Sequence, residues 1–451
     1  MRRPHSGSLR LATAASVLTI ALATGSTRPS AEPPAPVTFA GHIAPILARS
    51  CQRCHRAGGM APMSLTTYEE ARPWAAAIKR ETARRAMPPW FVDQDVGIQR
   101  YRDDPSLTDA EVATVAAWAD AGAPRGAGDT PPAPPVRPAS GRWSIGEPDL
   151  VVSSPEFTVE AVAPDWWGDL AMVPTGLTED RYVAAIETLE ISDRPSMAVL
   201  HHAGVQAFAD GQFEFGTIHE VGRNAETYDP EAAPRLRAGS VFGFNNAHLH
   251  AGGQKTTARL VVGVRFLPRG STPRFATSGL TLGSPELDVR GNTPGQSFEA
   301  FATLPQAMKL VTLEPHMHAA GSRMCLDAQW GVVRQTLTCV GFNPRWVRTY
   351  SYDADAAPLL PRGTILRLTG WMDTTPRAGN PYLVDFRNWT GWGSRPVDNM
   401  FMSYLSVVML NPDQLKALVA QRLEKVRRGE ADLRGCLPCT LPFALDQGTA
   451  R

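Results

Sequence analysis

The sequence predicts a multidomain protein in which a small all-α domain is followed by two all-β domains, each a sandwich of the jelly-roll kind. The chain has 451 residues, which is more than one ordinary domain needs. Apolar residues at helical spacing are concentrated in an N-terminal stretch and in a short C-terminal tail. Between them, short β-rich segments alternate with turns, for which 39 prolines and 38 glycines supply many positions.

The first residues have the pattern of an export signal. Arg2 and Arg3 precede an apolar stretch, Leu11–Ala23, that is shorter than a membrane span, and small residues follow it. We expect residues 1–31 to be a signal peptide that is removed on export, so that the mature protein is periplasmic or secreted. A membrane anchor is the alternative. We find no later segment long and apolar enough to span a bilayer, and we expect a soluble mature chain.

Residues 37–128 are expected to form the α-helical domain. Apolar positions recur at helical spacing in 39–50, 66–87 and 106–122. The last of these segments opens with a Ser/Thr-x-x-Glu-like cap and ends at a glycine. The proline-rich stretch that follows, 129–145, cannot hold a helix and is interpreted as a linker.

The remainder of the chain is expected to be β-structure closed by a helical tail. Residues 146–280 and 281–411 are assigned to the two jelly-roll domains, because their apolar segments are short and bounded by Gly or Pro. Residues 412–451 form the predicted tail. The net charge of +1 provides no general attraction to nucleic acid or to an acidic membrane surface, so neither is expected as a partner.

The stretch "CQRCH" has the haem attachment pattern C-x-x-C-H. Cys51 and Cys54 would join the haem vinyl groups as thioethers, and His55 would bind the iron from the proximal side. A disulfide or a zinc site is the alternative use of these residues. The sequence therefore predicts a covalently bound haem c.

A methionine thioether is the expected sixth ligand of that haem. The candidates are Met60, Met63 and Met87. Met60 and Met63 are close to the attachment motif in sequence, whereas Met87 follows a predicted helix and precedes two prolines, so Met87 is preferred; packing in the core is its alternative role. The segment resembles the class I cytochrome c domains that bacteria fuse to periplasmic enzymes, in which an "MPPW" loop recurs.

Six of the ten histidines form three close pairs. These pairs are His201 and His202, His248 and His250, and His316 and His318. Two of the pairs have i, i+2 spacing, which places both side chains on one face of a strand. The adjacent pair can share one ion only at a strand end or at a bulge, or through different ring nitrogens. Imidazole ligands suit copper and zinc alike, and a thioether ligand would favour Cu(I).

The order of these motifs resembles the copper type II, ascorbate-dependent monooxygenases, which include peptidylglycine α-hydroxylating monooxygenase and dopamine β-monooxygenase. The matching motifs are "LHHAG" with His201 and His202, "EPHMHAAG" with His316 and His318, and "VDNM" with Met400. The match covers residues 146–411. It implies two jelly-roll domains that each carry one copper ion, with His316, His318 and Met400 at the catalytic copper. Met402 is the rival soft ligand.

The first copper site departs from the family pattern. The family's third histidine would align with Arg265 in "VVGVRFLPRG", and arginine cannot bind copper because it has no free lone pair. His248 and His250, one strand upstream, are the candidate replacements, and both remain open. The sequence thus leaves it undecided whether the first site is complete.

Together these observations predict an exported monooxygenase that uses haem c and two copper ions to hydroxylate a C–H bond with O₂. In the resembled enzymes a soluble reductant such as ascorbate supplies the electrons. Here the tethered haem would relay them from an electron donor protein or a small reductant, and the substrate would be a small organic molecule. One alternative is a haem–copper electron-transfer or copper-binding protein without hydroxylase activity. Another is a binding module that recruits the cytochrome to a partner.

Two further cysteine pairs fit an exported, oxidised chain. Cys325 and Cys339 flank a predicted hairpin turn, and we expect a disulfide between them. Cys436 and Cys439 in "CLPC" are also expected to form a disulfide, with a redox dithiol as the alternative.

Overall fold

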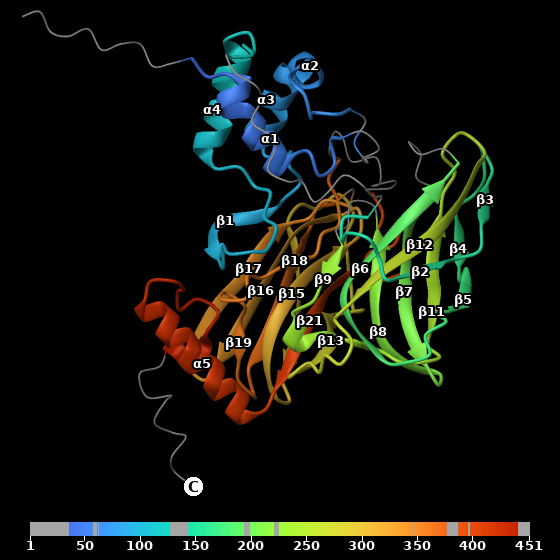
Figure 1. Ribbon diagram of the computed structural model, residues 1–451, viewed down its shortest axis with the longest axis vertical. Helices are drawn as coiled ribbons and strands as arrows, with labels where there is room; N and C mark the ends of the chain where they lie inside the picture. The colour runs from blue at the N-terminus through green and yellow to red at the C-terminus, as the bar shows by residue number, and fades with distance from the viewer. Residues whose placement is uncertain are drawn as a thin grey trace, which may run out of the picture. The chain divides into compact units, whose positions relative to one another are not determined.

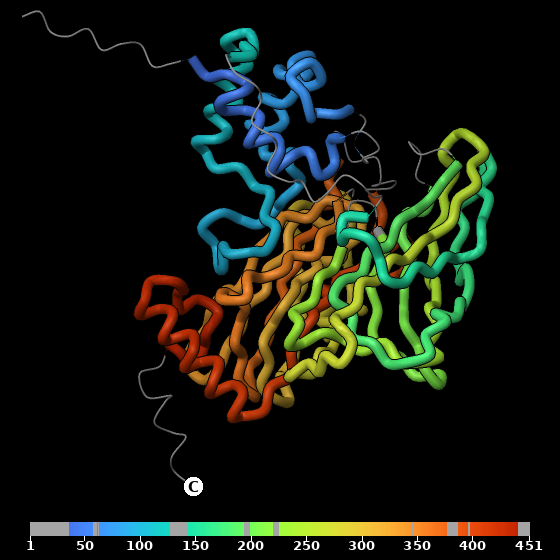
Figure 2. Tube along the Cα trace, in the orientation of Figure 1, coloured from blue at the N-terminus to red at the C-terminus, as the bar shows by residue number. Residues whose placement is uncertain are grey.

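The computed structural model describes most of the chain (Figure 2). Most of its regular structure is strand (Figure 1). The described residues are 36–56, 61, 63–126, 143–193, 199–220, 225–344, 346–376, 387–395 and 397–440. The predicted signal peptide, residues 129–142 of the predicted linker and Met60 lie outside them. Within the described residues, no helix is long and apolar enough to cross a membrane. The prediction of a mainly β-structured protein with few helices is confirmed.

The N-terminal part contains short helices that share one apolar core. They are η1 (Phe39–Ile43), α1 (Ala44–Ser50), α2 (Tyr68–Ala71), η2 (Arg72–Trp74), α3 (Ala75–Ala83) and α4 (Asp109–Asp120). Phe39, Leu47 and Trp118 are fully buried in this core. The predicted cap of the last helix is a capping box, in which Thr108 and Glu111 each bond the other's backbone amide.

A strand interrupts this helical part, which the sequence pattern did not indicate. β1 (Val92–Gly97) pairs with β17 (Val333–Gly341) at the edge of a sheet formed by the C-terminal half of the chain. Gly97 has φ +67°, and a Cβ atom there would lie 2.4 Å from the Leu337 carbonyl oxygen, so only glycine allows this approach. Next to the strand, Trp90 packs edge-on against Tyr350 with ring centroids 4.9 Å apart.

The first β region consists of two antiparallel sheets around one core. Its strands are β2 (Leu150–Ser153), β3 (Phe157–Val159), β4 (Trp166–Gly168), β5 (Ala171–Pro174), β6 (Arg181–Ser192), β7 (Leu200–Ala209), β8 (Gln212–Glu220), β9 (Glu226–Thr227), β10 (Arg235–Leu236), β11 (Val241–Leu249) and β12 (Thr256–Phe266). One sheet has the order β10-β6-β12-β2 and the other β4-β11-β7-β8. Val183 and Leu260 of the first sheet share a buried cluster with Val205 and Phe242 of the second. The two sheets therefore form a sandwich.

The second β region has the same two-sheet plan. Its strands are β13 (Ala276–Gly283), β14 (Gln296–Thr303), β15 (Ala307–Met317), β16 (Gly321–Trp330), β17, β18 (Tyr350–Ser351), β19 (Leu359–Leu360), β20 (Ile365–Met372) and β21 (Phe401–Leu410). The sheet orders are β1-β17-β16-β20-β14 and β13-β21-β15-β18. The predicted boundary between residues 280 and 281 falls inside β13, which pairs with β21 along its whole length.

Both predicted disulfides are present. Cys325 on β16 and Cys339 on β17 are directly opposite each other in the register of the hairpin, with Cα atoms 4.1 Å apart. Cys436 and Cys439 are also joined. Cys436 forms a parallel β-bridge with Leu359 and is buried in one cluster with it. The second disulfide is therefore packed against the body of the protein.

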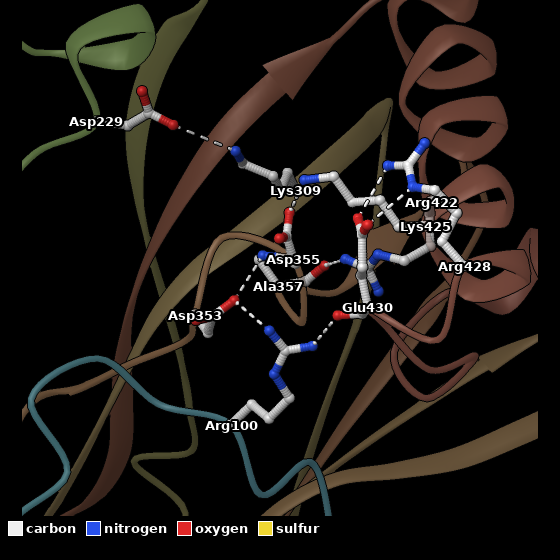
Figure 3. Close-up of polar contacts among 10 residues, drawn as sticks. All are labelled: Arg100, Asp229, Lys309, Asp353, Asp355, Ala357, Arg422, Lys425, Arg428 and Glu430. Atoms are coloured by element: carbon white, nitrogen blue, oxygen red, sulfur yellow. Dashed lines mark hydrogen bonds and ion pairs between the residues drawn. The ribbon is translucent and has the colours of Figure 1, made fainter.

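The helix α5 (Pro412–Arg427) forms the first part of the predicted tail and is anchored by polar contacts (Figure 3). The Arg422 guanidinium donates to the Ala357 carbonyl oxygen at 2.9 Å. Lys425 Nζ lies 2.5 Å from Asp355 Oδ1. Val419 adds apolar contact in a cluster that includes Leu359.

Two further ion pairs join segments that are distant in sequence (Figure 3). Arg100 pairs with Asp353 at 3.1 Å and also donates to the Glu430 carbonyl oxygen at 3.0 Å. Lys309 on β15 lies 3.5 Å from Asp229, which belongs to the first β region. These contacts link three parts of the chain by side chains rather than by strand pairing alone.

Candidate metal centres

Three histidines of the first β region converge on one point. His201 and His202 come from β7 and His248 from β11, and one ring nitrogen of each lies within 4.8 Å of the other two. The Nδ1 atoms of His201 and His202 are 3.2 Å apart. His250 is not a member of this group. Of the two candidates for a third ligand, the structure therefore brings His248 to the adjacent pair.

Irregular strand pairing explains how adjacent histidines reach the same point. Leu200 is opposite Leu249 and His202 is opposite His248, so two steps along β7 match one step along β11. His201 is the extra residue of this bulge. A compensating irregularity follows on β11, where Asn246 has φ +49°. The expected strand end or bulge at the histidine pair is thus a bulge.

His248 is held as a metal-binding histidine needs to be held. It is 4% exposed, its Nε2 lies 2.9 Å from Asp165 Oδ2, and its ring stacks on Trp167 with centroids 3.8 Å apart. Burial lowers its pKa, which favours the neutral ring, while the bond to Asp165 opposes that shift. Its buried Nδ1 has no hydrogen-bond partner in the described part of the chain. The Nε2–H therefore donates to the carboxylate, and the Nδ1 lone pair is left for a ligand.

The geometry of the adjacent pair fits two imidazole ligands of one metal ion, and His248 lies within reach as a third. Two metal–nitrogen bonds of about 2.0 Å at an angle of about 90–110° separate the nitrogens by about 2.8–3.3 Å. The separation of 3.2 Å between the Nδ1 atoms of His201 and His202 falls in this range. An all-imidazole site suits copper and zinc, and three protein ligands leave a coordination position for a small molecule.

Arg265 lies away from the three-histidine group. It sits on β12 opposite Ala185, in the other sheet of the sandwich, and its Nη1 donates to the Ile145 carbonyl oxygen at 3.2 Å. The position that the family pattern assigns to the third histidine is therefore not the position from which a third histidine reaches the pair here. His248 reaches it from β11.

A second histidine pair lies in the second β region. His316 near the end of β15 and His318 just after it have ring centroids 5.7 Å apart. His316 is directly opposite Met402 on β21, and the next pair is Met317 opposite Phe401. His318 and Met400 each lie one residue beyond this last pair, outside the two strands. Met402 is therefore the methionine that the strand register places opposite a histidine of the pair.

His318 is oriented by the loop that carries Met400. Its Nδ1 lies 3.0 Å from the Asp398 carbonyl oxygen, so Nδ1–H donates to that oxygen. The Asp398 side chain makes a two-pronged pair with Arg395, which holds the pKa of that carboxyl below its usual value. Two imidazoles and a thioether form a donor set that suits Cu(I).

The C-x-x-C-H motif opens onto a cavity of about 560 Å³. Cys51, Cys54 and His55 line it, and both thiols are free. His55 Nδ1 lies 3.2 Å from the Met63 carbonyl oxygen, which leaves Nε2 available as an axial ligand. A cavity of this size is in the range that holds drug-sized ligands and cofactors. The residues present therefore fit a covalently attached haem.

Both described methionine candidates line the same cavity. The Met63 backbone bonds to the proximal candidate His55, whereas Met87 comes from the segment after α3. This difference favours Met87 for the opposite side of a haem. The cavity is also lined by Trp143, Trp346 and Arg348, which lie outside the predicted helical domain and carry no haem motif of their own.

The sequence interpretation missed the residues that orient the candidate ligands. Asp165 is 83 residues from His248, and Asp398 is 80 residues from His318. Neither residue stands in a local pattern that suggests its role. The contact of Trp167 with His248 could not be predicted either, because it depends on the pairing of β4 with β11.

Comparisons with known proteins leave the family of the chain open. No family model matches the sequence, and no characterised protein matches it. A turret protein of Sulfolobus turreted icosahedral virus has 8% identity and a TM-score of 0.15, covering 58% of this chain and 100% of that one. The N-terminal CBM22-1–CBM22-2 tandem domain of Xyn10C from Paenibacillus barcinonensis has 6% identity and a TM-score of 0.14, with coverage of 58% and 94%. The VP2 subviral particle of infectious bursal disease virus has 10% identity and a TM-score of 0.16, with coverage of 63% and 90%. These scores are too low to support an inference.

Proposed function

We propose that this protein is an exported monooxygenase that hydroxylates a C–H bond with O₂, using a haem c and two mononuclear copper ions. In this proposal the N-terminal helices form a class I cytochrome c domain, and the two β regions are jelly-roll domains of the copper type II monooxygenase kind. The observation that carries the proposal is the convergence of His201, His202 and His248, with the buried Nδ1 of His248 left without a partner. Of the two candidates that the sequence left open for the third ligand, this group contains His248.

The two β regions support different roles because their donor atoms differ. The first offers three imidazoles. The second offers two imidazoles, with Met402 opposite His316 and Met400 two residues before Met402. Thioether ligation favours the reduced metal, so the second group is assigned to the O₂-reactive copper and the first to electron storage. When bound, the copper ions supply O₂ activation and the haem supplies electrons.

The protein's own residues prepare three ligands in the same way. Asp165 accepts from His248, the Asp398 carbonyl accepts from His318, and the Met63 carbonyl accepts from His55. In each case a protein acceptor holds one ring nitrogen, and in this proposal the other ring nitrogen binds the metal. Such acceptors set the tautomer and the ring orientation before the metal binds.

The proposed reaction balances with an external reductant. One C–H bond and the O–O bond break, one oxygen atom enters the product as a hydroxyl group, and the other leaves as water. Two electrons and two protons are taken up in each cycle. The electrons come from an electron donor protein or a small reductant by way of the haem, and the substrate is a small organic molecule.

The test uses the exported, copper-loaded protein with isotopically labelled O₂ and a panel of small organic substrates, followed by mass spectrometry of the products. The wild type is expected to place one labelled oxygen atom in a product, and His316→Ala to abolish this. His250→Ala is the matched control, since His250 is outside the three-histidine group, and it should retain activity. A protein that holds haem and both coppers but labels no product would instead support the electron-transfer alternative.

A further inference from the structure

The cavity at the C-x-x-C-H motif is lined by a buried cation that has no partner among the described residues. Arg348 is 8% exposed and lines the cavity beside the C-x-x-C-H motif. Its Nε is buried and has no hydrogen-bond partner within the described ranges. An arginine side chain stays protonated, and burying such a charge without a partner is costly. An anion bound beside Arg348 would compensate this buried charge.

The carboxylates that line the cavity do not pair with Arg348. They are Glu81, Asp103 and Asp104, and in the described chain none of them forms an ion pair with Arg348. Glu81 is paired with Arg80 and Arg84 instead. Burial lowers the pKa of Arg348, and the other groups that act on this pKa are Cys54, Arg53 and Tyr350. Cys54 and a second cation, Arg53, line the same cavity as this guanidinium.

We propose that Arg348 binds a propionate carboxylate of the haem, so that the second β region completes the haem pocket. This inference rests on the haem attachment in the proposed function. A haem joined to Cys51 and Cys54 carries two propionates, which are its anionic groups. A planar guanidinium matches a carboxylate with two parallel hydrogen bonds, and the pairing removes the unpartnered buried charge.

The same contact would tie the haem to the strand that carries the second histidine pair. Thr349, next to Arg348, donates from Oγ1 to Oε2 of Glu314, and both residues are buried. Glu314 is on β15, two residues before His316. A propionate on Arg348 therefore lies at the start of a short path of bonded residues that leads to His316.

The experiment measures the haem reduction potential of the full-length exported protein in the wild type, Arg348→Gln and Arg348→Lys. Reduction adds negative charge to the haem, so losing a buried cation at a propionate favours the oxidised form. We expect Arg348→Gln to shift the reduction equilibrium about tenfold, which lowers the potential by about 59 mV for one electron. Arg427→Gln, an exposed arginine on α5, is the control and should leave the potential unchanged.

Resonance Raman spectra of the haem propionate bending modes give a second readout. Arg348→Lys keeps the charge but loses the planar guanidinium. Its reduction potential should therefore stay close to the wild-type value, while the frequency of the propionate mode shifts. If Arg348→Gln does not fold with haem, the lysine variant alone decides the question. An unchanged potential in Arg348→Gln, or an unchanged propionate mode in Arg348→Lys, would overturn the proposal. A chain without covalent haem would instead refute the proposed function.

Discussion

Nε2 of His248 lies 2.9 Å from Oδ2 of Asp165, so a carboxylate from the loop before β4 orients a histidine of β11. The ring of this histidine is at the same time stacked on Trp167, and its other nitrogen is buried without a partner in the described residues. A histidine fixed on one side and open on the other is preorganised as a ligand. The contact with Asp165 therefore orients the histidine that joins His201 and His202 in the three-histidine group.

Asp165→Asn should weaken copper binding at the three-histidine group. The amide cannot stabilise the ligand through a charge-assisted bond, and loss of such outer partners costs about 10–100-fold in metal affinity. Competition with a Cu(I) chelator measures the change. Glu160→Gln is the control, because Glu160 is an exposed carboxylate paired with Lys255. An affinity of Asp165→Asn within about twofold of the wild type would contradict this role.

The two methionines beside the second histidine pair should behave differently. We expect Met400→Leu to lose Cu(I) binding at this group, because Met400 follows Asp398, whose carbonyl holds His318. Met402→Leu should keep it and serves as the matched control. X-ray absorption at the copper edge detects the sulfur ligand directly. Sulfur scattering that survives in Met400→Leu and disappears in Met402→Leu would assign the ligand to Met402.

The hairpin disulfide should contribute more stability than the C-terminal disulfide. Cys325 and Cys339 close a loop with a sequence separation of 14, which corresponds to about 3 kcal/mol of free energy of unfolding. Cys436 and Cys439 are separated by 3, which corresponds to about 1.6 kcal/mol. Denaturant unfolding of the two double Cys→Ser variants compares these losses. Equal losses would show that loop closure does not govern the difference.

Glu190 should make the stability of the first β region depend on pH. Burial raises its pKa to about 7, against the hydrogen bonds that it accepts from the amides of Val199 and Leu200. The folded chain therefore binds a proton more tightly than the unfolded chain, whose carboxyl has its ordinary pKa of 4.5. The free energy of unfolding falls as the pH rises from 4.5 to about 7, and the penalty persists above that range.

Glu190→Gln removes this titration while it keeps an acceptor for the Val199 amide. Above pH 7 we expect the variant to be more stable than the wild type by about 2 kcal/mol, and below pH 4.5 the two should converge. Urea unfolding across this pH range measures the difference. Parallel stability curves for the two proteins would rule out Glu190 as the source of the pH dependence.

Much of the architecture can be predicted from local sequence patterns. The residue that joins the histidine pair in the first site cannot. Strand spacing indicated a mainly β chain, and the cysteine positions indicated both disulfides. The choice of His248 over His250 depends on bulges that set the register of β7 against β11. No local sequence pattern records such a register, because it arises from pairing between strands distant in sequence.

β1 and Arg348 could not be predicted from the sequence for the same reason, because both depend on contacts between residues distant in sequence. β1 lies in a stretch with a helical pattern on both sides, and its partner β17 is more than two hundred residues further along the chain. Arg348 stands in a segment without a motif, and only tertiary packing brings it to Cys54. The role of a side chain that acts through long-range contacts can therefore be identified only from the structure.

The most direct test of the account is the number of copper ions per haem in the exported, copper-loaded, full-length protein, measured by metal analysis and haem absorbance. The account predicts two coppers per haem in the wild type and one in His248→Ala, with His250→Ala unchanged at two. A wild-type protein that binds one copper or none per haem, or that keeps both coppers in His248→Ala, would contradict it.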